Sequence, residues 1–231
     1  MTTRILIARH GNTFTKDQIP TRVGRRTDLP LVEEERSRNL GKYIKAQNLL
    51  PTVVFAAPLK RTMQTSKLAI EEMQTNVELL PNNQFLEIDY GPDENKTEAE
   101  VRLRLGKNQV IKNGELPDNY TVGALQEKGK QIIELWNKQA LVPDGWLVTP
   151  AQLIKNWLDF AAMIERSYQN QTVMVVSSNG IIRFAPYITQ DFNKFIATYD
   201  IKVATGSLSV FEKSANAQYW DCIAWNINPS K

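Results

Sequence analysis

The chain is poor in residues that cross-link a protein or bind a transition metal. Its 231 residues include one cysteine, Cys222, and one histidine, His10. A single cysteine excludes an internal disulfide framework and gives no sign of a metal held by thiolates. Such sparing use of cysteine fits a reducing compartment, so we expect a cytoplasmic protein.

Strong charge of one sign and long apolar runs are also missing. The formal net charge is +3, from 28 lysine and arginine residues against 25 acidic ones, which is too small to indicate nucleic-acid binding. No apolar run is long enough to cross a bilayer, and no charged leader with a long apolar stretch opens the chain, so we expect no membrane association and no signal peptide. The 42% of hydrophobic residues is typical of a globular protein with a full core.

Short β-rich runs alternate with helical patterns along the chain. Apolar runs that predict strands alternate with stretches whose apolar residues recur at helical spacing. Two late runs, at 207–212 and 220–226, would suit an antiparallel pair. This order predicts an α/β fold, a three-layer α/β/α sandwich with a mainly parallel central sheet, in a single domain over 1–231. The expected strands are 4–8, 52–56 and 172–177, and the expected helices are 33–50, 58–73, 96–105, 125–136 and 150–169.

Two local expectations concern the middle of the chain. Gly106 follows the short helical pattern at 96–105, and glycine commonly ends a helix, so we expect that helix to stop there. The segment QFLEI at 84–88 is interpreted as extended.

The strongest local pattern is LIARHGNT at 6–13. A buried strand runs into a tight turn and presents Arg9 and His10 at its carboxyl end, where open α/β sheets bind ligands. Gly11 lets the backbone turn and approach a ligand closely. An isolated histidine is more often a polar residue satisfied near a core, but these neighbours favour a functional role.

Five segments resemble, in order, the motifs of the histidine phosphatase superfamily, also called phosphoglycerate mutase-like. The Arg-His-Gly tripeptide corresponds to the first motif of that family, and the other four follow across about four-fifths of the chain, which makes the set far more specific than any one motif. GRRTDLPL at 24–31 is similar to G-R-x-D-x-P-L with one residue inserted, APLKRTMQT at 57–65 to S-P-L-x-R-x-x-Q-T, LEIDYGPDENKTEAE at 86–100 to L-x-E-x-x-(F/Y)-G with the helix after it, and VVSSNGIIR at 175–183 to V-S-H-G-x-x-I-R.

The resemblance implies roles for four side chains of the matching motifs. His10 would attack phosphorus and divide hydrolysis into two steps through a phosphohistidine. Arg9 and Arg61 would bind phosphate oxygens, lower the pKa of His10 and stabilise the transferring group. Glu87 would be the general acid and later the base that activates water, which requires a raised pKa.

Acidic residues follow Glu87 at Asp89, Asp93 and Glu94. Asp89 and Glu94 could help to raise the pKa of Glu87, or all of these carboxylates could lie on the surface or cap the next helix. A hard cation is another option. The resemblance implies that arginines stand where other phosphatases hold divalent ions, so we expect no metal and no other cofactor.

The densest basic cluster consists of Arg22, Arg25 and Arg26, close in sequence to His10. Such a cluster is usually a solvated surface. Beside a phosphate site it could also attract anionic substrates.

One residue of the family pattern is missing. The alignment places Ser178 where the family has a second histidine, and Asn179 where it has a glycine. His10 is the only histidine, so no shift of the alignment restores the second one. We assign Ser178 to phosphate binding, but serine donates one hydrogen bond without a positive charge. Losing a charged donor to a developing oxyanion costs about 100- to 1000-fold in rate.

Several functions therefore stay open. The chain could be a slow or specialised phosphatase, with Ser178, Asn179 or Lys16 in place of the histidine, or a relative that only binds phosphorylated ligands, or Ser178 could be an engineered change. Nucleophile and acid occur together, which favours a metal-independent phosphatase for a small phosphate monoester. Mutase activity is a further alternative, but Arg102 and Arg104 do not form the adjacent pair of the mutases.

The segment 107–149 is the weakest part of the resemblance. We expect it to be a variable insertion that covers the active site. Trp136 and Trp146 lie in it, and core or lid packing is the simpler interpretation of both. The expected partner is a small phosphorylated substrate, and a dimer is one option for the oligomeric state.

Overall fold

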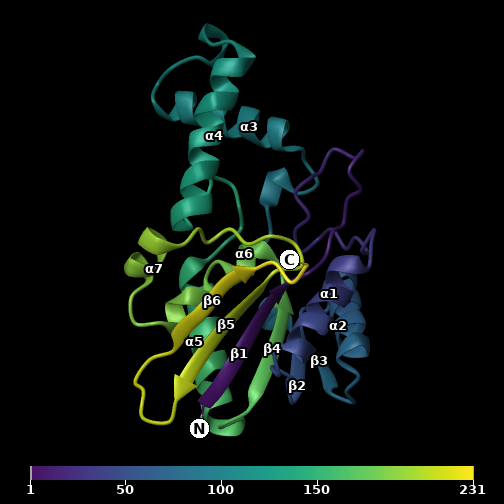
Figure 1. The fold of residues 1–231 in the computed structure, drawn as a ribbon. Helices are drawn as coiled ribbons and strands as arrows, with labels where there is room; N and C mark the ends of the chain where they lie inside the picture. The colour runs from purple at the N-terminus through teal and green to yellow at the C-terminus, as the bar shows by residue number, and fades with distance from the viewer. Residues whose placement is uncertain (1, 231) are drawn as a thin grey trace.

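The computed structural model describes residues 2–230, and its strands form one mixed sheet (Figure 1). The strand order is β3-β2-β4-β1-β5-β6. The first four strands in this order are parallel, and β5 and β6 add an antiparallel edge. The predicted α/β fold with a mainly parallel sheet is therefore confirmed. The strands are β1 (Thr2–Arg9), β2 (Val53–Ala56), β3 (Glu78–Pro81), β4 (Thr172–Ser177), β5 (Leu208–Ser214) and β6 (Asp221–Ile227).

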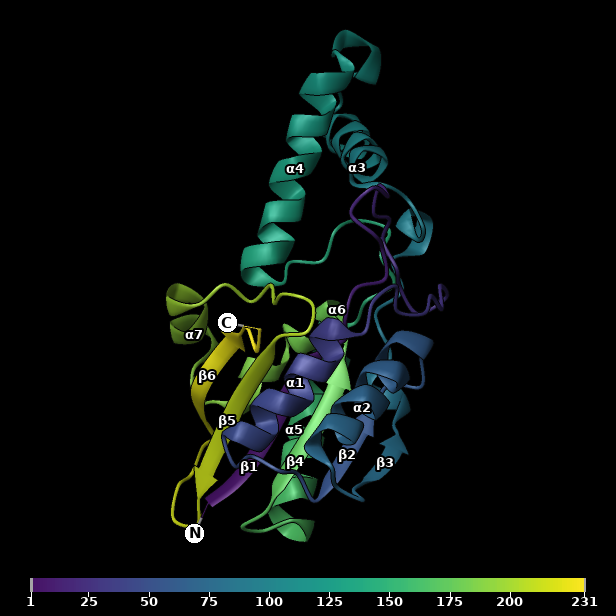
Figure 2. The same cartoon turned by 45° about the vertical axis from the view of Figure 1, so that its right-hand side comes forward.

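Alternate residues of the central strands face opposite helical layers. On β1, Leu6 belongs to a buried cluster with α1 (Glu35–Ala46) and α2 (Lys60–Met73), whereas its neighbour Ile5 belongs to a cluster with α5 (Pro150–Ser167). Figure 2 shows the sheet between these two layers. Burial on both faces explains why the central strands are unbroken apolar runs rather than alternating patterns.

Two long helices, α3 (Glu98–Lys112) and α4 (Val122–Gln139), project from the body beyond the end of the sheet where the parallel strands finish (Figures 1 and 2). The prediction that Gly106 ends the first of these helices is wrong, because α3 continues to Lys112. Gly106 instead lies at the contact with α4. A Cβ there would be 1.8 Å from the carbonyl oxygen of Leu125.

A glycine of α4 makes the same kind of close backbone contact with α3. A Cβ on Gly129 of α4 would lie 1.9 Å from the carbonyl oxygen of Arg102. The two glycines therefore let the two helix backbones touch. Gly106 therefore allows α3 to pack against α4 instead of ending the helix. Local sequence patterns do not reveal this contact, because its partner lies on another helix.

Two smaller expectations also need correction. The segment expected to be extended at 84–88 begins with a 3-10 turn, Asn83–Phe85, because the side chain of Asn82 accepts a hydrogen bond from the Gln84 amide and Phe85 is buried. On α5, the helical spacing of Leu158 with Trp157, Ala161 and Ile164 predicts that it faces the core, but Leu158 is 46% exposed and Phe160 is buried instead.

The remaining helices are short. None of the helices between residues 2 and 230 is long and apolar enough to cross a membrane. The short elements are α6 (Asn179–Ile182), α7 (Phe192–Thr198) and the 3-10 turns Gly91–Asp93, Pro117–Asn119 and Ala185–Ile188.

Replacing Gly106 with alanine tests the close contact of α3 with α4. We expect Gly106→Ala to lower the free energy of unfolding by about 1–3 kcal/mol, because the new methyl group overlaps the backbone of the partner helix. Gly123→Ala is the matched control, since it lies in open space on α4 and alanine favours a helix over glycine by about 1 kcal/mol. Urea unfolding of both variants measures the difference. Equal free energies of unfolding for Gly106→Ala and Gly123→Ala would show that the close approach of α3 to α4 is not needed for stability.

Candidate active site

A pocket of about 710 Å³ lies between the carboxyl ends of the parallel strands and α4. Its lining includes Arg9 and His10 at the end of β1, Glu87, and Asn179 at the start of α6. The structure therefore brings together predicted residues from three distant segments. Arg61 and Ser178 are fully buried and are not among the described residues that line the pocket.

His10 is fixed by its backbone and by its ring. Its amide donates to the carbonyl of Ser177 at the end of β4 (3.1 Å), and its own carbonyl accepts from Gly206 (3.0 Å). The ring Nδ1 lies 2.7 Å from the carbonyl oxygen of Gly11. A carbonyl can only accept, so this contact assigns the proton to Nδ1 and leaves the lone pair on Nε2.

The surroundings of His10 favour the neutral ring. Burial, followed by the positive charges of Arg9 and Arg61, holds the pKa of His10 well below its ordinary value of 6.5, and the hydrogen bond to Gly11 opposes this only in part. His10 therefore keeps an unprotonated Nε2 at neutral pH. That is the state a nitrogen nucleophile needs.

Arg9 is held by the segment before β5. Its Nη1 donates to the carbonyl of Val203 (2.6 Å), and the Val203 amide donates to Oδ1 of Asn179 (2.9 Å). Asn179, which replaces the glycine of the family pattern, thus anchors the segment that anchors Arg9. The Nε of Arg9 is buried and has no hydrogen-bond partner among the described residues.

Arg61 lies in the first turn of α2 and is fully buried. Its Nη1 donates to the carbonyl of Thr27 (3.0 Å) and its Nη2 to that of Gly24 (3.3 Å), so the second sequence motif forms its cradle. Asp28 of the same motif accepts from the Lys60 amide (2.7 Å) at the start of α2. The Nε of Arg61, like that of Arg9, has no partner within the described part of the chain.

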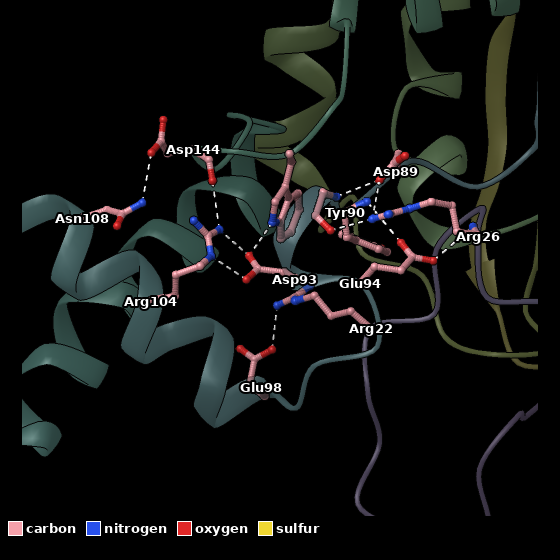
Figure 3. Close-up of polar contacts among 12 residues, drawn as sticks. Arg22, Arg26, Asp89, Tyr90, Asp93, Glu94, Glu98, Arg104, Asn108 and Asp144 are labelled. Carbon is pink, nitrogen blue, oxygen red and sulfur yellow. Dashed lines mark hydrogen bonds and ion pairs between the residues drawn. The ribbon is translucent and has the colours of Figure 1, made fainter.

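The carboxylate of Glu94, which Figure 3 shows beside Arg26, holds that cradle in place. Its Oε1 accepts from the amides of Gly24 (3.1 Å) and Arg26 (3.1 Å) and from the hydroxyl of Thr27 (2.8 Å). The fit is tight, because a Cβ on Gly24 would lie 2.0 Å from Glu94. Glu94 therefore positions the carbonyls that position Arg61.

Glu87 is 4% exposed, and burial raises its pKa. Its carboxylate accepts from the amides of Ile88 (2.9 Å) and Gly180 (3.3 Å), which together with Arg61 act in the opposite direction. A Cβ on Gly180 would lie 2.2 Å from this carboxylate, so only glycine leaves room for it.

Of the two interpretations of Asp89 and Glu94, an effect on Glu87 is not found, because burial is the cause that raises the pKa of Glu87. The acidic residues after Glu87 are instead bound by protein donors. Asp89 pairs with Arg26 (3.1 Å), and the buried Asp93 accepts from Arg104 Nε (2.6 Å) and Trp146 Nε1 (2.7 Å). Figure 3 shows these contacts at the base of the projecting helices. Between residues 2 and 230 no group of acidic, histidine or cysteine side chains could hold a metal ion.

Ser178 is the N-cap residue of α6, and its buried hydroxyl has no hydrogen-bond partner among the described residues. Lys16, an alternative replacement for the missing histidine, lines the pocket from the loop after β1. Ser178 carries no charge of the kind that a second histidine would supply.

Sequence reasoning missed Arg183, the last residue of the fifth motif. It is 1% exposed and lines the pocket. Its Nη1 donates to the carbonyl of Trp136 (2.6 Å), and its guanidinium carbon lies 3.9 Å from the centre of a ring of the same residue. Burial lowers the pKa of Arg183 to about 10. Its place in a motif was the signal that could have marked it.

Comparison with known proteins identifies relatives of the same kind. A family model described as histidine phosphatase superfamily (branch 1) matches residues 5–134. The 2,3-bisphosphoglycerate-dependent phosphoglycerate mutase of Parvibaculum lavamentivorans is 31% identical over 110 residues, which are 46% of this chain and 51% of that protein. The match therefore spans about half the length of this curated relative.

Solved structures share the fold over nearly the whole chain. Phosphoglycerate mutase from Bacillus anthracis has a TM-score of 0.69 at 16% identity and covers 99% of this chain and 94% of its own. A mycobacterial glucosyl-3-phosphoglycerate phosphatase in complex with inorganic phosphate has a TM-score of 0.68 at 14% identity, with 99% of each chain covered. At such identities the likeness shows the fold alone.

Glu94→Gln tests the cradle of Arg61. The amide turns one acceptor into a donor that faces other donors, so the 24–27 segment should loosen and Arg61 should lose its place. A hydrogen bond to a charged group contributes about 1.5–3 kcal/mol, so we expect the affinity for inorganic phosphate, measured by calorimetry, to fall about 10- to 100-fold.

The matched control is Asp144→Asn, at a carboxylate that pairs with Lys112 at the projecting helices. It should leave phosphate affinity unchanged. Thermal unfolding of both variants separates a local effect from loss of the fold. A folded Glu94→Gln protein that binds phosphate as tightly as the wild type would contradict the role of Glu94.

Proposed function

The chain belongs to the histidine phosphatase superfamily, as its motifs predicted, and on that premise we propose that it is a metal-independent phosphatase of small phosphate monoesters. One observation carries the proposal. His10 has a free Nε2 and a lowered pKa in the same pocket as Glu87, a buried carboxyl with a raised pKa. A nucleophile and an acid matched in this way are what transfer of a phosphoryl group from an alkoxide requires.

In the first half-reaction, Nε2 of His10 bonds to phosphorus while the bond from phosphorus to the ester oxygen breaks. Glu87, protonated, gives its proton to that oxygen, so that the alcohol leaves neutral. The ring gains positive charge as it is phosphorylated, and the Gly11 carbonyl that accepts from Nδ1 stabilises this charge. Arg9 and Arg61 offer their unpartnered Nε groups to the phosphate oxygens.

In the second half-reaction, Glu87 acts as the base. Its carboxylate takes a proton from a water molecule that attacks phosphorus, and the bond between phosphorus and Nε2 breaks. Inorganic phosphate leaves, His10 returns to the neutral ring, and Glu87 is again protonated. The opposing influences on its pKa suit both roles, because burial favours the acid while Arg61 and two amides favour the carboxylate.

Ser178 completes the phosphate site in this proposal. Its buried hydroxyl without a partner could donate one hydrogen bond to a phosphate oxygen. It supplies no positive charge, so we propose a slow enzyme. Residues Lys130, Ile133 and Trp136 of α4 line the pocket, which supports a covering role for the 107–149 segment over a small phosphorylated substrate.

A second candidate is a relative that binds phosphorylated ligands without turnover, and the serine at position 178 is the observation that favours it. Mutase activity has less support. Arg104 is bound to Asp93 and Arg102 to Glu98, so these two arginines are not a free pair for a substrate carboxylate.

Acid-labile phosphate on His10 tests the proposal. We expect p-nitrophenyl phosphate to leave phosphate on His10 when the reaction is quenched, and none in His10→Ala. Because this substrate has a good leaving group, Glu87→Gln should still allow the first step while slowing attack by water. Phosphohistidine should therefore accumulate in that variant, as measured by mass spectrometry.

Turnover that persists in His10→Ala would contradict the proposed mechanism. The binding-only alternative predicts a different result. It requires no turnover of any phosphate monoester by the wild type, together with phosphate binding that is lost in Arg9→Ala.

A further inference from the structure

Asn179 is the second departure from the family pattern in the fifth motif, and unlike Ser178 its side chain is open to the pocket. Ser178 is fully buried and is not among the described residues that line the pocket, whereas Asn179 lines it from the start of α6. The family pattern has a glycine at this position, which brings no side chain. This chain therefore adds an amide group to the pocket where the pattern has none.

The side-chain amide of Asn179 is fixed in one orientation. The backbone N–H of Val203 points at it from 2.9 Å, and because an N–H only donates, the side-chain atom that faces Val203 is Oδ1. The Nδ2 on the other branch makes no hydrogen bond with the described residues, and it is not among the buried atoms that lack a partner. Since Asn179 lines the pocket, its Nδ2 is a donor that a ligand can reach.

The backbone of Asn179 is held as firmly as its side chain. Its carbonyl accepts from Nε of Arg183 (3.3 Å), and the amide that follows it, that of Gly180, donates to Glu87 (3.3 Å). A donor that is fixed in this way binds a ligand with little further loss of side-chain entropy.

These contacts connect Asn179 both to a phosphate-binding arginine and to the acid. Its Oδ1 accepts from Val203, whose carbonyl accepts from Nη1 of Arg9 (2.6 Å). Its C-terminal peptide bond supplies the N–H that Glu87 accepts. In the proposed reaction Arg9 binds the phosphoryl group and Glu87 protonates the oxygen that this group leaves. A donor connected to both residues is therefore well placed to reach the oxygens of the transferring group.

We propose that Asn179 is a further catalytic residue, whose Nδ2 donates a hydrogen bond to an oxygen of the phosphoryl group during transfer. The inference rests on the proposed function, because the phosphoryl group has to be bound at His10. Donors that are already in place stabilise the charge that develops on such oxygens. The amide thus takes over the hydrogen bond, though not the positive charge, of the histidine that the family has one position earlier.

The side-chain amide signals in an NMR spectrum test this contact directly. In isotope-labelled protein the Nδ2 pair of Asn179 is assigned through its own carbons, and inorganic phosphate is the probe. A proton donated to a phosphate oxygen is deshielded, so we expect one Nδ2 proton to shift downfield with the same dissociation constant as the change in the His10 ring signals. Asn226 is the matched control, because its Oδ1 accepts from the Ala204 amide (2.8 Å) but it is not among the described residues that line the pocket. Its pair should stay in place.

Two variants separate the donor from the anchor of Val203. Asn179→Asp keeps the acceptor for the Val203 amide but replaces the donor with a charged oxygen, whereas Asn179→Ala adds no charge but loses the anchor as well. The lost donor is what the two variants share. Removing one donor from an oxyanion site typically costs about 100- to 1000-fold in kcat, so we expect both to lower kcat for p-nitrophenyl phosphate by about 100-fold or more. Asn226→Asp should keep the wild-type kcat.

The outcomes separate this inference from the proposed function. If the His10 signals show bound phosphate while the Asn179 pair stays in place, or if either folded Asn179 variant keeps the wild-type kcat, the inference is overturned and the phosphatase stands. If the Asn179 pair shifts with phosphate but the wild type hydrolyses no ester, the hydrogen bond is supported and the phosphatase is overturned. If neither His10 nor Asn179 responds to phosphate, both are overturned.

Discussion

Two guanidinium groups beside one imidazole, that of Arg61 buried and that of Arg9 partly buried, form the constraint on which the rest of the site depends. A buried cation without compensation is costly, and a carboxylate is its usual partner. Here the hydrogen-bond partners of Arg9 and Arg61 are backbone carbonyls of Val203, Gly24 and Thr27. These carbonyls bind terminal nitrogens of the two side chains without cancelling their charge, and each Nε stays without a partner among the described residues. The positive potential at His10 therefore survives, and the ring stays neutral with its Nε2 free.

A second layer of contacts holds those carbonyls in position. Glu94 gathers three donors of the 24–27 segment, and Asn179 fixes Val203. Further out, Asp93 ties α3 to the segment before α5 through Arg104 and Trp146, and this brings the projecting helices over the pocket. The site lies at the carboxyl ends of the parallel strands, and its two arginines come from the end of β1 and the first turn of α2.

Local patterns predicted what local forces determine. The apolar runs located β1, β2 and β4 along the chain, and the Arg-His-Gly turn marked the pocket. Gly106 was misjudged because its partner, Leu125 of α4, lies on another helix that no local rule connects to it. The sequence left open whether Glu94 supports Glu87, because closeness along the chain does not fix closeness in space, and in the structure it binds the 24–27 segment. The surroundings of Arg183 and Arg22 were likewise not predictable from local patterns, because each guanidinium lies over an aromatic ring from a distant segment, Trp136 and Trp146 respectively.

NMR titration of His10 tests this electrostatic picture most directly, and the chain has no other histidine to confuse the signal. The folded-state pKa lies well below 6.5, so the ring should keep its neutral, Nδ1-protonated form as the pH falls from neutral through 6.5. Arg61→Gln removes one of the two cations that lower this pKa, so its His10 should take up a proton at a higher pH than the wild type. A wild-type imidazole that titrates near 6.5 would contradict the role given to Arg9 and Arg61.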